Sequence, residues 1–450
     1  MFKSFNLSHI FSRTGNILVV FLIVGWAIFR LYAYGDPKLS IAGNDTETFI
    51  EGSKVPLFSK EMMTGRRLLT TNLIYMFFEP ENGYKILVNG SLETSRRVYQ
   101  PGFDNIVILQ FLVSIISWSV LTYILAAQMN STLSKALTAL VIPAFAYTPQ
   151  IADWDSILMS ESLTFSLFVL QLGLLIHIVF KIYKNPAAKV SPWVILWGVI
   201  YFFWANLRDT NNYAALVLVG LSILTLFVPS FRKNKKIIGI AIFGLLLFAI
   251  GIVTFQQSER SLLSTINIYI GDIFPYPARV EYMQKQLGMP EPQTNEFYAW
   301  FEGNGVTAAT RFIFAHPGYA LEKLSRDFPD AFHQGTQTYF TIPDKKIFRQ
   351  YLVSIGEGFH PQTITPFLIS IVFLLTTLFA AIQGKIKTAP PWLWISTYIL
   401  MVSTIAIVPT ILGDTWALHR HTIFSIAMYR LSMWLCILIL IDFSLSKTSQ

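Results

Sequence analysis

The sequence predicts an all-α polytopic membrane protein with about ten transmembrane helices and two sizeable segments outside the membrane. Of its 450 residues, 53% are hydrophobic and only 13% are charged, whereas a soluble protein carries roughly 25% charged residues. The mean hydropathy is positive, at +0.50. Apolar stretches of about 20 residues, the length that a spanning helix needs, recur along the chain. Lipid is therefore the expected solvent for most of its surface.

Ten apolar stretches are candidates for spans, of which the third and the fifth are short. They divide the chain into an N-terminal transmembrane module (1–256) with a long first outer loop (35–103), an outer-face helical segment (257–365) and C-terminal transmembrane helices (366–450). The expected spans are 15–34, 104–128, 134–150, 158–180, 192–208, 212–230, 237–256, 366–383, 391–412 and 422–443.

The distribution of lysine and arginine predicts the orientation, because basic residues concentrate in cytoplasmic loops. Alternate short loops hold many basic residues, whereas the opposite set holds only Arg208 and Arg420. Both termini are therefore expected in the cytoplasm of a multi-pass protein of the cell (inner) membrane, with an uncleaved first span. The cytoplasmic basic residues are Lys3, Arg13, Lys135, Lys181, Lys184, Lys189, Arg232, Lys233, Lys235, Lys236, Lys385, Lys387 and Lys447.

The placement of the charges also limits the function. The net charge of +8 would suit nucleic acid, but its positive groups lie in short loops beside the membrane, so no nucleic-acid partner is expected. Of the 26 Asp and Glu residues, only Asp442 falls on the cytoplasmic side. Carboxylate chemistry is therefore expected on the outer face. The single cysteine, Cys436, lies in an apolar run and forms no disulfide framework.

Both outer segments contain predicted helices. In the first, RRLLTTNLIYMFFEP has the pattern of an amphipathic helix that can lie in the membrane interface. The second has helical stretches near 276–287, 306–315 and 317–327, with a break at Ala315-His316-Pro317. A segment of this length, 257–365, could form a compact lid or subdomain.

Asp45 and Glu47, in NDTETF of the first outer loop, are the first candidates for chemistry. An aspartate near the membrane surface could act as a general base toward an acceptor hydroxyl or amine. Asp-x-Glu could also contribute to a divalent-cation site. The alternative is structural: Asn44 or Asp45 caps a helix, and Glu47 interacts favourably with its dipole.

A second acidic group, IADWDSILMSESLTF, lies at the outer mouth of the fourth span. Asp155 or Ser156 could cap that span, which would explain Asp153 and Asp155 without a function. Glu161 sits at or just inside the apolar boundary, where ionisable residues are costly and tend to mark sites.

Basic residues gather at the ends of later spans. Arg208 ends the fifth span, either as a snorkelling arginine or at the mouth of a central cavity near Glu161. Arg430 lies on the order of 12 Å inside the tenth span, where an arginine needs an anionic partner; a structural ion pair is the alternative to a ligand phosphate. A helix that includes His419 places it on the same face as Arg430. The resulting cationic cluster, suited to phosphate or pyrophosphate, would be His419, Arg420, His421 and Arg430.

Four short motifs and the topology together resemble the GT-C superfamily of membrane glycosyltransferases, which includes the protein O-mannosyltransferases and the aminoarabinose transferase that modifies lipid A. The resemblance covers most of the chain in topology. The motifs are NDTETF followed by GRRLLTTNLIYMFF, then DWDSILMSESLTF, NLRDTNNY and LHRHTIF.

The resemblance implies inverting transfer of a sugar from a polyprenyl-phosphate donor, on the periplasmic or lumenal face, to an acceptor glycan, lipid or protein. It implies that Asp45 deprotonates the acceptor and that Glu161 is a second acidic site residue. Membrane lipid would surround the site, and a divalent cation is conceivable. The residues expected to bind substrate are Glu47, Arg208, His419, Arg420, His421 and Arg430.

Two other functions remain open from the sequence. An O-antigen ligase or polymerase would also use outer arginines and histidines but would not need Asp45. A transporter or flippase of lipid-linked glycans often has repeated halves and broken helices at mid-membrane. We find no internal repeat, and the charged candidates lie at the outer end of the spans.

Overall fold

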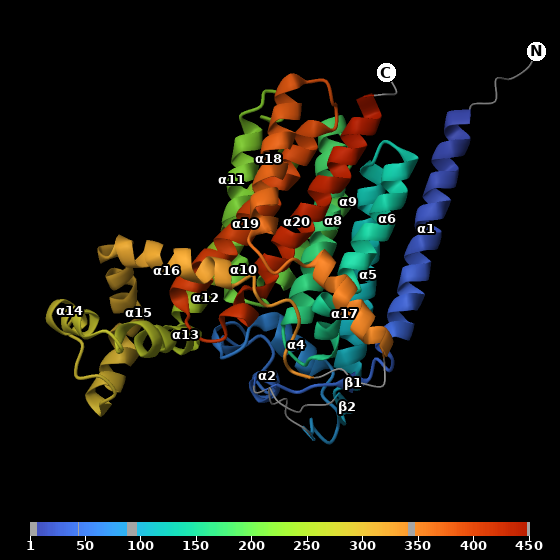
Figure 1. Ribbon diagram of the computed structural model, residues 1–450. Coiled ribbons are helices and arrows are strands. Elements are labelled where there is room, and N and C mark those ends of the chain that lie inside the picture. The colour runs from blue at the N-terminus through green and yellow to red at the C-terminus, as the bar shows by residue number, and fades with distance from the viewer. Residues whose placement is uncertain (1–6, 44, 88–96, 341–346, 448–450) are drawn as a thin grey trace, which may run out of the picture.

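The computed structural model describes residues 7–43, 45–87, 97–340 and 347–447. Within these ranges helices predominate (Figure 1), and the strands found are β1 (Leu39–Ser40) and β2 (Val98–Tyr99). The two strands pair antiparallel, with Leu39 opposite Tyr99 and Ser40 opposite Val98. The predicted all-α class is therefore confirmed.

A bundle of long apolar helices forms the body of the protein. Seven described helices are long and apolar enough to cross a membrane. Three predicted spans correspond to helices shorter than the roughly 20 residues of a full crossing, namely α6 (Thr132–Ala146), α9 (Ser191–Ala205) and α11 (Ala214–Leu226). The total of ten crossings stays a prediction. The seven long helices are α1 (Leu7–Tyr34), α5 (Asp104–Gln128), α8 (Glu161–Lys184), α12 (Lys235–Gln256), α18 (Thr365–Gln383), α19 (Ala389–Gly413) and α20 (Leu418–Lys447).

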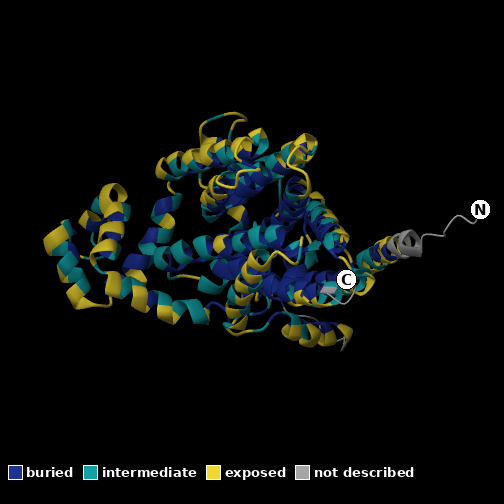
Figure 2. Cartoon of the chain, turned by 90° about the horizontal axis from the view of Figure 1, so that it is seen from above, coloured by how far each residue is buried: buried dark blue, intermediate teal, exposed yellow. Residues whose placement is uncertain are grey.

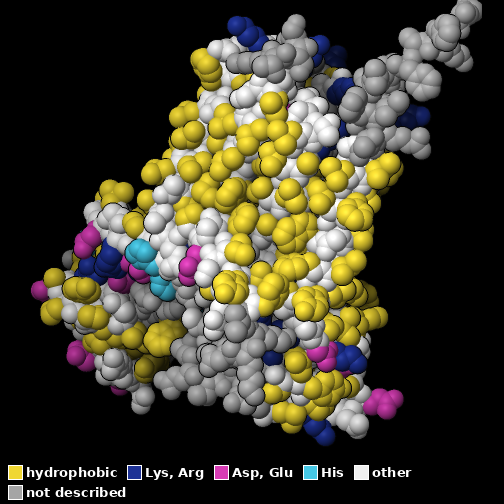
Figure 3. Space-filling model, turned by 45° about the vertical axis from the view of Figure 1, so that its right-hand side comes forward, with side chains coloured by type: hydrophobic (Ala, Val, Ile, Leu, Met, Phe, Trp, Pro, Cys, Tyr) yellow, Lys and Arg dark blue, Asp and Glu magenta, His cyan; other side chains and the backbone are white. Residues whose placement is uncertain are grey.

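The helices differ in how deeply they are buried. In both α8 and α20, 83% of the most apolar stretch is buried within the protein, against 22% in α1. Figure 2 shows the buried residues concentrated inside the bundle. The outer sides of the helices carry exposed apolar residues, and Figure 3 shows them as a continuous hydrophobic surface along the bundle. This surface and these helices are those of a multi-pass membrane protein.

The two ends of the bundle differ in charge and in content. α1 begins and α20 ends at the same end (Figure 1), and Figure 3 shows lysine and arginine gathered there. The loops and helices of both outer segments lie at the other end, together with most of the visible carboxylates. The segments predicted to share one side of the membrane therefore lie together.

The first outer loop folds into three short helices, α2 (Thr46–Ser53), α3 (Glu61–Thr64) and α4 (Leu69–Phe77). α4 is the predicted amphipathic helix, and its polar face is the one that packs inward. Thr70, Thr71 and Asn72 are buried, whereas Phe77 is 81% exposed. The Thr70 hydroxyl donates to the Phe203 carbonyl oxygen at 2.7 Å, which ties α4 to the end of α9.

Two buried ion pairs join the first span, the short helix that precedes the fourth span, and the second outer segment. Arg30 pairs with Asp155, and Arg349 pairs with Asp153. All four side chains are at most 5% exposed, and we call them the α1–η1 cluster, after η1 (Asp153–Ser156). The expectation that Asp155 or Ser156 caps the fourth span is wrong, because α8 begins only at Glu161. Asp155 instead accepts a hydrogen bond from the Ser162 hydroxyl at 2.6 Å.

The second outer segment separates into two parts. Its first part is a lobe with its own apolar core around Tyr269, Phe297 and Phe312, and it extends to one side of the bundle (Figure 1). Its second part, α17 (Ile347–Phe359), returns to pack against α6 and α7 (Pro149–Ala152). The lobe consists of α13 (Arg260–Ile268), one π-helical turn η2 (Tyr269–Ile273), α14 (Pro277–Leu287), α15 (Asn295–Ala315) and α16 (Pro317–Asp330).

The lobe is tied together by charge as well as by apolar packing. Lys323 on α16 is 2% exposed, and its ammonium lies 2.7 Å from Asp272 of η2 and 3.0 Å from Asp327. The predicted break at Ala315-His316-Pro317 is confirmed, since α15 ends at Ala315 and α16 begins at Pro317.

Candidate functional site

A cavity of about 610 Å³ opens where the first outer loop, the lobe and the ends of several spans meet. This volume lies within the range of small-molecule sites, which measure roughly 300–1,000 Å³. Residues from α2, α4, α8, α12, α13, α19 and α20 line it. The predicted site residues among the lining are Asp45, Glu161, Arg208, Arg420 and His421.

Asp45 stands at the N-cap position of α2, but its side chain does not cap the helix. Its Oδ1 lies 2.9 Å from the Arg67 guanidinium, and its Oδ2 lies 2.9 Å from that of Arg420. Burial alone would raise the pKa of Asp45, but Arg420 and Arg67 outweigh burial and hold the pKa below its usual value. The capping explanation for this aspartate is therefore not supported; the other proposed cap, Asn44, lies outside the described residues.

Arg67 is positioned by α2 as well as by α4, which begins two residues after it. Its Nε donates to the Thr48 hydroxyl at 2.6 Å, and its guanidinium lies 4.2 Å from the centre of the Phe49 ring. An arginine stacked on an aromatic ring and bonded at Nε has little rotational freedom left. It therefore fixes the direction of the Asp45 carboxylate.

Glu161 lies in the first turn of α8 and is 3% exposed. Its Oε1 is 3.7 Å from the Arg420 Nε and 4.0 Å from the Arg208 Nη1. These distances permit an ion pair but are too long for a hydrogen bond. Glu161 Oε2 and Arg420 Nε are both buried without a hydrogen-bond partner in the described part of the chain. Buried polar atoms normally have partners, so these two are suited to a bound polar group or water.

These contacts link Asp45, Arg67, Glu161, Arg208 and Arg420 into one network, which we call the cavity cluster. Three arginines against two carboxylates give it one net positive charge. Burial lowers the pKa of the Arg208 guanidinium, and Glu161 only partly counteracts it. An anionic group entering the cavity would complete the charge balance. Arginine is also the side chain best suited to hold phosphate oxygens.

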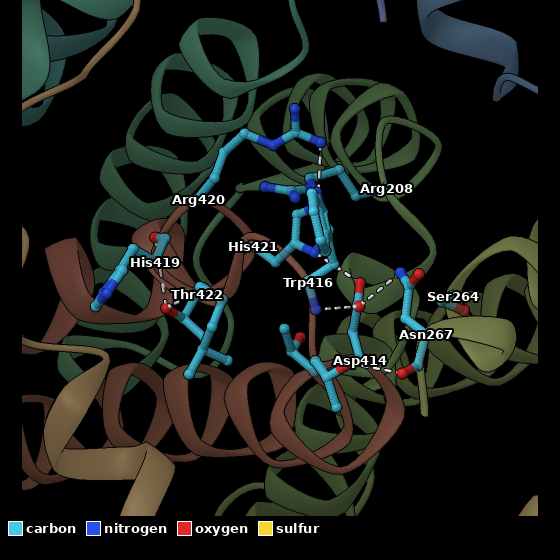
Figure 4. Close-up of polar contacts among 12 residues, drawn as sticks. Arg208, Ser264, Asn267, Asp414, Trp416, His419, Arg420, His421 and Thr422 are labelled. Carbon is cyan, nitrogen blue, oxygen red and sulfur yellow. Dashed lines mark hydrogen bonds and ion pairs between the residues drawn. The ribbon is translucent and has the colours of Figure 1, made fainter. Parts of the chain in front are cut away.

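A second polar layer faces the cavity cluster from the lobe. Arg260 of α13 holds Asp209 through two hydrogen bonds of 2.9 and 3.1 Å, and also donates to the carbonyl oxygens of Met63 and Gly65. At the other end of α13, the Asn267 amide donates to Asp414 at 2.9 Å (Figure 4). The lobe is thus attached to the cavity wall at both ends of α13.

Apolar side chains line the cavity as well. They are Tyr213 beside α11, Phe255 at the end of α12, Leu263 of α13 and Pro409 of α19. A lining that combines charged groups with apolar side chains from the ends of spans suits an amphipathic ligand.

Three of the predicted substrate-binding residues do not line this cavity, which corrects their expected position. Glu47 is exposed in the first turn of α2. His419 turns toward α16, where its Nε2 is 3.8 Å from Asp330. Arg430 is 2% exposed and donates to the carbonyl oxygens of Phe332 at 3.0 Å and Pro361 at 3.1 Å.

α20 includes His419, so the condition under which His419 and Arg430 share a face is met. His419 contacts Asp330, the last residue of α16, and Arg430 contacts Phe332, two residues beyond that helix. The carboxylate or phosphate partner expected for Arg430 is replaced by backbone carbonyl oxygens, which accept hydrogen bonds from its guanidinium.

The side chains present do not make a preformed cation site. In the described ranges no three His, Cys, Asp or Glu side chains come together as metal ligands. Both oxygens of Asp45 already face arginines, and Glu47 lies outside the cavity. The expected Asp-x-Glu contribution to a divalent-cation site therefore does not fit.

Sequence reasoning missed three residues that contact the predicted ones. Arg67 pairs with Asp45, Tyr339 accepts a hydrogen bond from Arg420 at 3.1 Å, and Asp414 pairs with His421. Arg67 could have been singled out, because GRRLLTTN was already part of a motif. The other two gave no sequence signal, since Tyr339 lies 81 residues from its partner and Asp414 is one of many outer carboxylates.

Comparisons with known proteins add little to this geometry. No protein-family profile matches the chain, and no curated protein does. The chain is similar in structure to the apo form of the Archaeoglobus fulgidus oligosaccharyltransferase, with a TM-score of 0.46 and 10% identity over 94% of this chain and 50% of that one. The chain thus spans about half the length of that protein. Its function is inferred below from its own residues.

Proposed function

We propose that this protein is a membrane glycosyltransferase of the GT-C type, which transfers a sugar from a polyprenyl-phosphate donor to an acceptor at the outer face of the cell membrane. The observation that carries the proposal is the cavity cluster, which brings Asp45, Glu161 and three arginines together at a cavity that apolar side chains also line. Such a reaction requires a base, a site for a phosphate and a path for a lipid chain.

The arginines would bind the phosphate of the donor. Arg420 and Arg208 flank Glu161, and Arg420 Nε has no hydrogen-bond partner in the described structure. Their positive charge would stabilise the phosphate as the bond to the sugar breaks, because preorganised cations favour the developing negative charge. Tyr213, Phe255, Leu263 and Pro409 would contact the first part of the prenyl chain.

Asp45 would act as the base. The acceptor hydroxyl or amine attacks the anomeric carbon while Asp45 takes its proton, and the bond from that carbon to the phosphate oxygen breaks. The products are an inverted glycoside and polyprenyl phosphate. The proton on Asp45 then passes to water.

The ligand-free geometry makes Asp45 a weak base, because two guanidinium groups hold its pKa low. A donor phosphate that draws Arg420 toward itself would remove one of them and raise the basicity of the aspartate. Donor binding would therefore prepare the base for the acceptor.

The test is transfer by the purified protein in lipid nanodiscs, supplied with a panel of polyprenyl-phosphate sugars and a membrane extract as the source of acceptor. Mass spectrometry would follow the release of polyprenyl phosphate. We expect one donor to be consumed, Asp45→Asn to reduce kcat by about 10²–10⁴-fold, as for loss of a general base, and Arg420→Ala chiefly to raise the KM for donor.

Each alternative function has its own signature in this experiment. Asp45→Asn with full activity would favour a ligase or polymerase that needs no such base. Movement of the intact donor across the bilayer without its consumption would indicate a flippase. Failure to bind or consume any donor in the panel would overturn the proposal.

The proposed orientation puts both termini in the cytoplasm and residues 257–365 outside. Reporter fusions at residue 450 and within the lobe test it, and a cytosolic lobe would contradict it.

A further inference from the structure

A chain of hydrogen bonds that begins outside the cavity cluster holds the Arg420 guanidinium. His421, next to it in the first turn of α20, lies between Arg420 and Asp414 (Figure 4). The Arg420 Nη2 is 3.0 Å from the His421 Nε2, and the His421 Nδ1 is 2.8 Å from the Asp414 Oδ2.

The direction of each bond follows from the groups involved. A guanidinium has only donors, so the His421 Nε2 must accept and cannot carry a proton. The proton of the neutral imidazole is then on Nδ1, where it donates to Asp414. Asp414 in turn accepts at Oδ1 from the Asn267 amide and from the Trp416 backbone N–H, each at 2.9 Å.

Arg420 is bound from the cavity side as well. Its Nη1 donates to the Tyr339 hydroxyl at 3.1 Å, and its Nη2 lies 2.9 Å from Asp45. Its Nε, which faces Glu161 at 3.7 Å, is without a hydrogen-bond partner in the described structure. The bonds at the two Nη atoms therefore fix the plane of the guanidinium and leave the buried Nε–H directed toward Glu161.

The backbone beside this chain of bonds is strained. Ala417, directly before α20, has φ of +50°, a left-handed conformation that residues with a Cβ rarely adopt. Such strain persists only where the surroundings hold it in place. The bonds of Asp414 to Trp416 and Asn267 supply that restraint on one side.

We infer that Asp414 and His421 are a positioning pair for Arg420: Asp414 keeps His421 in the Nδ1–H form, and His421 Nε2 holds the guanidinium in one plane at the cavity, beside Asp45 and Glu161. The inference rests on the proposed function for its kinetic assay. Asp414 and His421 themselves do not touch the reacting atoms. Asn267 connects the pair to α13, so the lobe contributes to the alignment of Arg420.

Two substitutions of His421 separate its two hydrogen bonds. The amide of Asn can replace the Nδ1 donor to Asp414 but does not reach Arg420, whereas the longer Gln can place an acceptor near the Nε2 position. We expect His421→Asn to raise the KM for donor about tenfold, the value of one hydrogen bond to a charged group, with kcat changed by less than about threefold. We expect His421→Gln to restore most of the affinity.

Substitution of the other member of the pair gives a second readout. Asp414→Asn should raise the KM for donor as well, because His421 then loses the carboxylate that holds its Nδ1–H. His419→Gln is the matched control, because His419 lies two residues before His421 and outside the cavity. The kinetics of this variant should equal those of the wild type.

The inference is overturned if Asn and Gln at position 421 have equal effects, or if Asp414→Asn leaves the KM for donor unchanged. Failure of the proposed function is distinguishable, because the wild type would then consume no donor at all. The tautomer can still be tested in that case: ¹⁵N spectra of histidine-labelled protein, assigned with His421→Gln, should give the Nδ1–H form for His421. The Nε2–H form would overturn the inference independently of activity.

Discussion

The two arginine–carboxylate clusters at this end of the bundle are built from the same residue types and differ in whether they face a cavity. In the α1–η1 cluster, Arg30 and Asp155 are 0% and 3% exposed, and Arg349 and Asp153 are similarly buried. In the cavity cluster, Asp45 is 31% and Arg420 is 24% exposed. The first cluster is sealed inside the protein, whereas the second opens into a cavity of about 610 Å³.

The carboxylates differ in their bonding as well. Asp155 accepts from Arg30 and Ser162, and Arg30 also donates to the Ala152 carbonyl oxygen at 2.9 Å. Glu161, only six positions after Asp155, has no hydrogen bond to either of the arginines beside it and lines the cavity. The arginines do not follow this division, because Arg30 and Arg349 also have buried nitrogen atoms without a hydrogen-bond partner in the described structure. Contact with the cavity, more than residue type or complete pairing, distinguishes the two clusters.

The largest expected effect is on stability and comes from breaking the sealed cluster. Asp155→Asn leaves the Arg30 charge buried without an anion, and removal of one partner of a buried pair costs on the order of 3–5 kcal/mol. We expect a clear fall in the unfolding temperature of the protein in nanodiscs, followed by tryptophan fluorescence. The double variant Arg30→Met with Asp155→Leu should recover much of the loss, because a buried ion pair can often be replaced by apolar residues of similar size. An Asp155→Asn protein that unfolds at the wild-type temperature would contradict the assigned role.

The cavity cluster should respond in activity instead. Glu161→Gln keeps the shape of the side chain and removes its charge, so Arg208 and Arg420 lose their shared counter-ion. We expect transfer to fall by roughly 10-fold or more, since loss of one charged contact costs about 1.5–3 kcal/mol, while the unfolding temperature changes little. If Glu161→Gln instead lowers stability strongly while the protein that stays folded has a normal kcat, then Glu161 has a structural role like that of Asp155.

A smaller effect concerns pH and Asp45. Its folded pKa is lowered by Arg420 and Arg67, so its contribution to stability is present above the unfolded pKa and is lost as pH falls through the lowered folded value. Wild type should therefore be slightly more stable than Asp45→Asn at pH 7, by under about 1 kcal/mol for a partly exposed pair. The gap in unfolding temperature should close in acid. A gap that widens on acidification would show that Asp45 is not paired as described.

Much of the fold follows from local sequence properties. Apolar length predicted the long spans, and His316-Pro317 predicted the break between α15 and α16, because proline cannot continue a helix at that point. Asp45, Glu161, Arg208, Arg420 and His421 all line one cavity, whereas Arg430, which was predicted to converge with Asp45, Glu161 and Arg208, lies outside it. All five lie at the outer ends of elements, and the alternation of spans brings such ends together.

The features that the sequence did not predict depend on long-range packing. Arg430 finds its partners at the carbonyls of Phe332 and Pro361, 98 and 69 residues away, and backbone groups leave no mark in composition. The return of α17 to the bundle depends on Arg349 meeting Asp153, 196 residues apart. No local pattern indicates which of many carboxylates a given arginine will reach.

The smallest expected effect distinguishes two carboxylates that lie two residues apart. Asp45 points into the cavity from the N-cap of α2, and two further positions along a helix turn the chain by about 200°, which leaves Glu47 exposed on the far side. Glu47→Gln should therefore leave kcat, KM and the unfolding temperature unchanged within about 0.5 kcal/mol, as for a surface substitution, while Asp45→Asn in the same preparation loses activity. Transfer assays on the two variants side by side measure the difference. If both variants lost the same activity, Asp45 and Glu47 would act together. Asp45 would then exchange its contacts with the arginines for a different partner during the reaction.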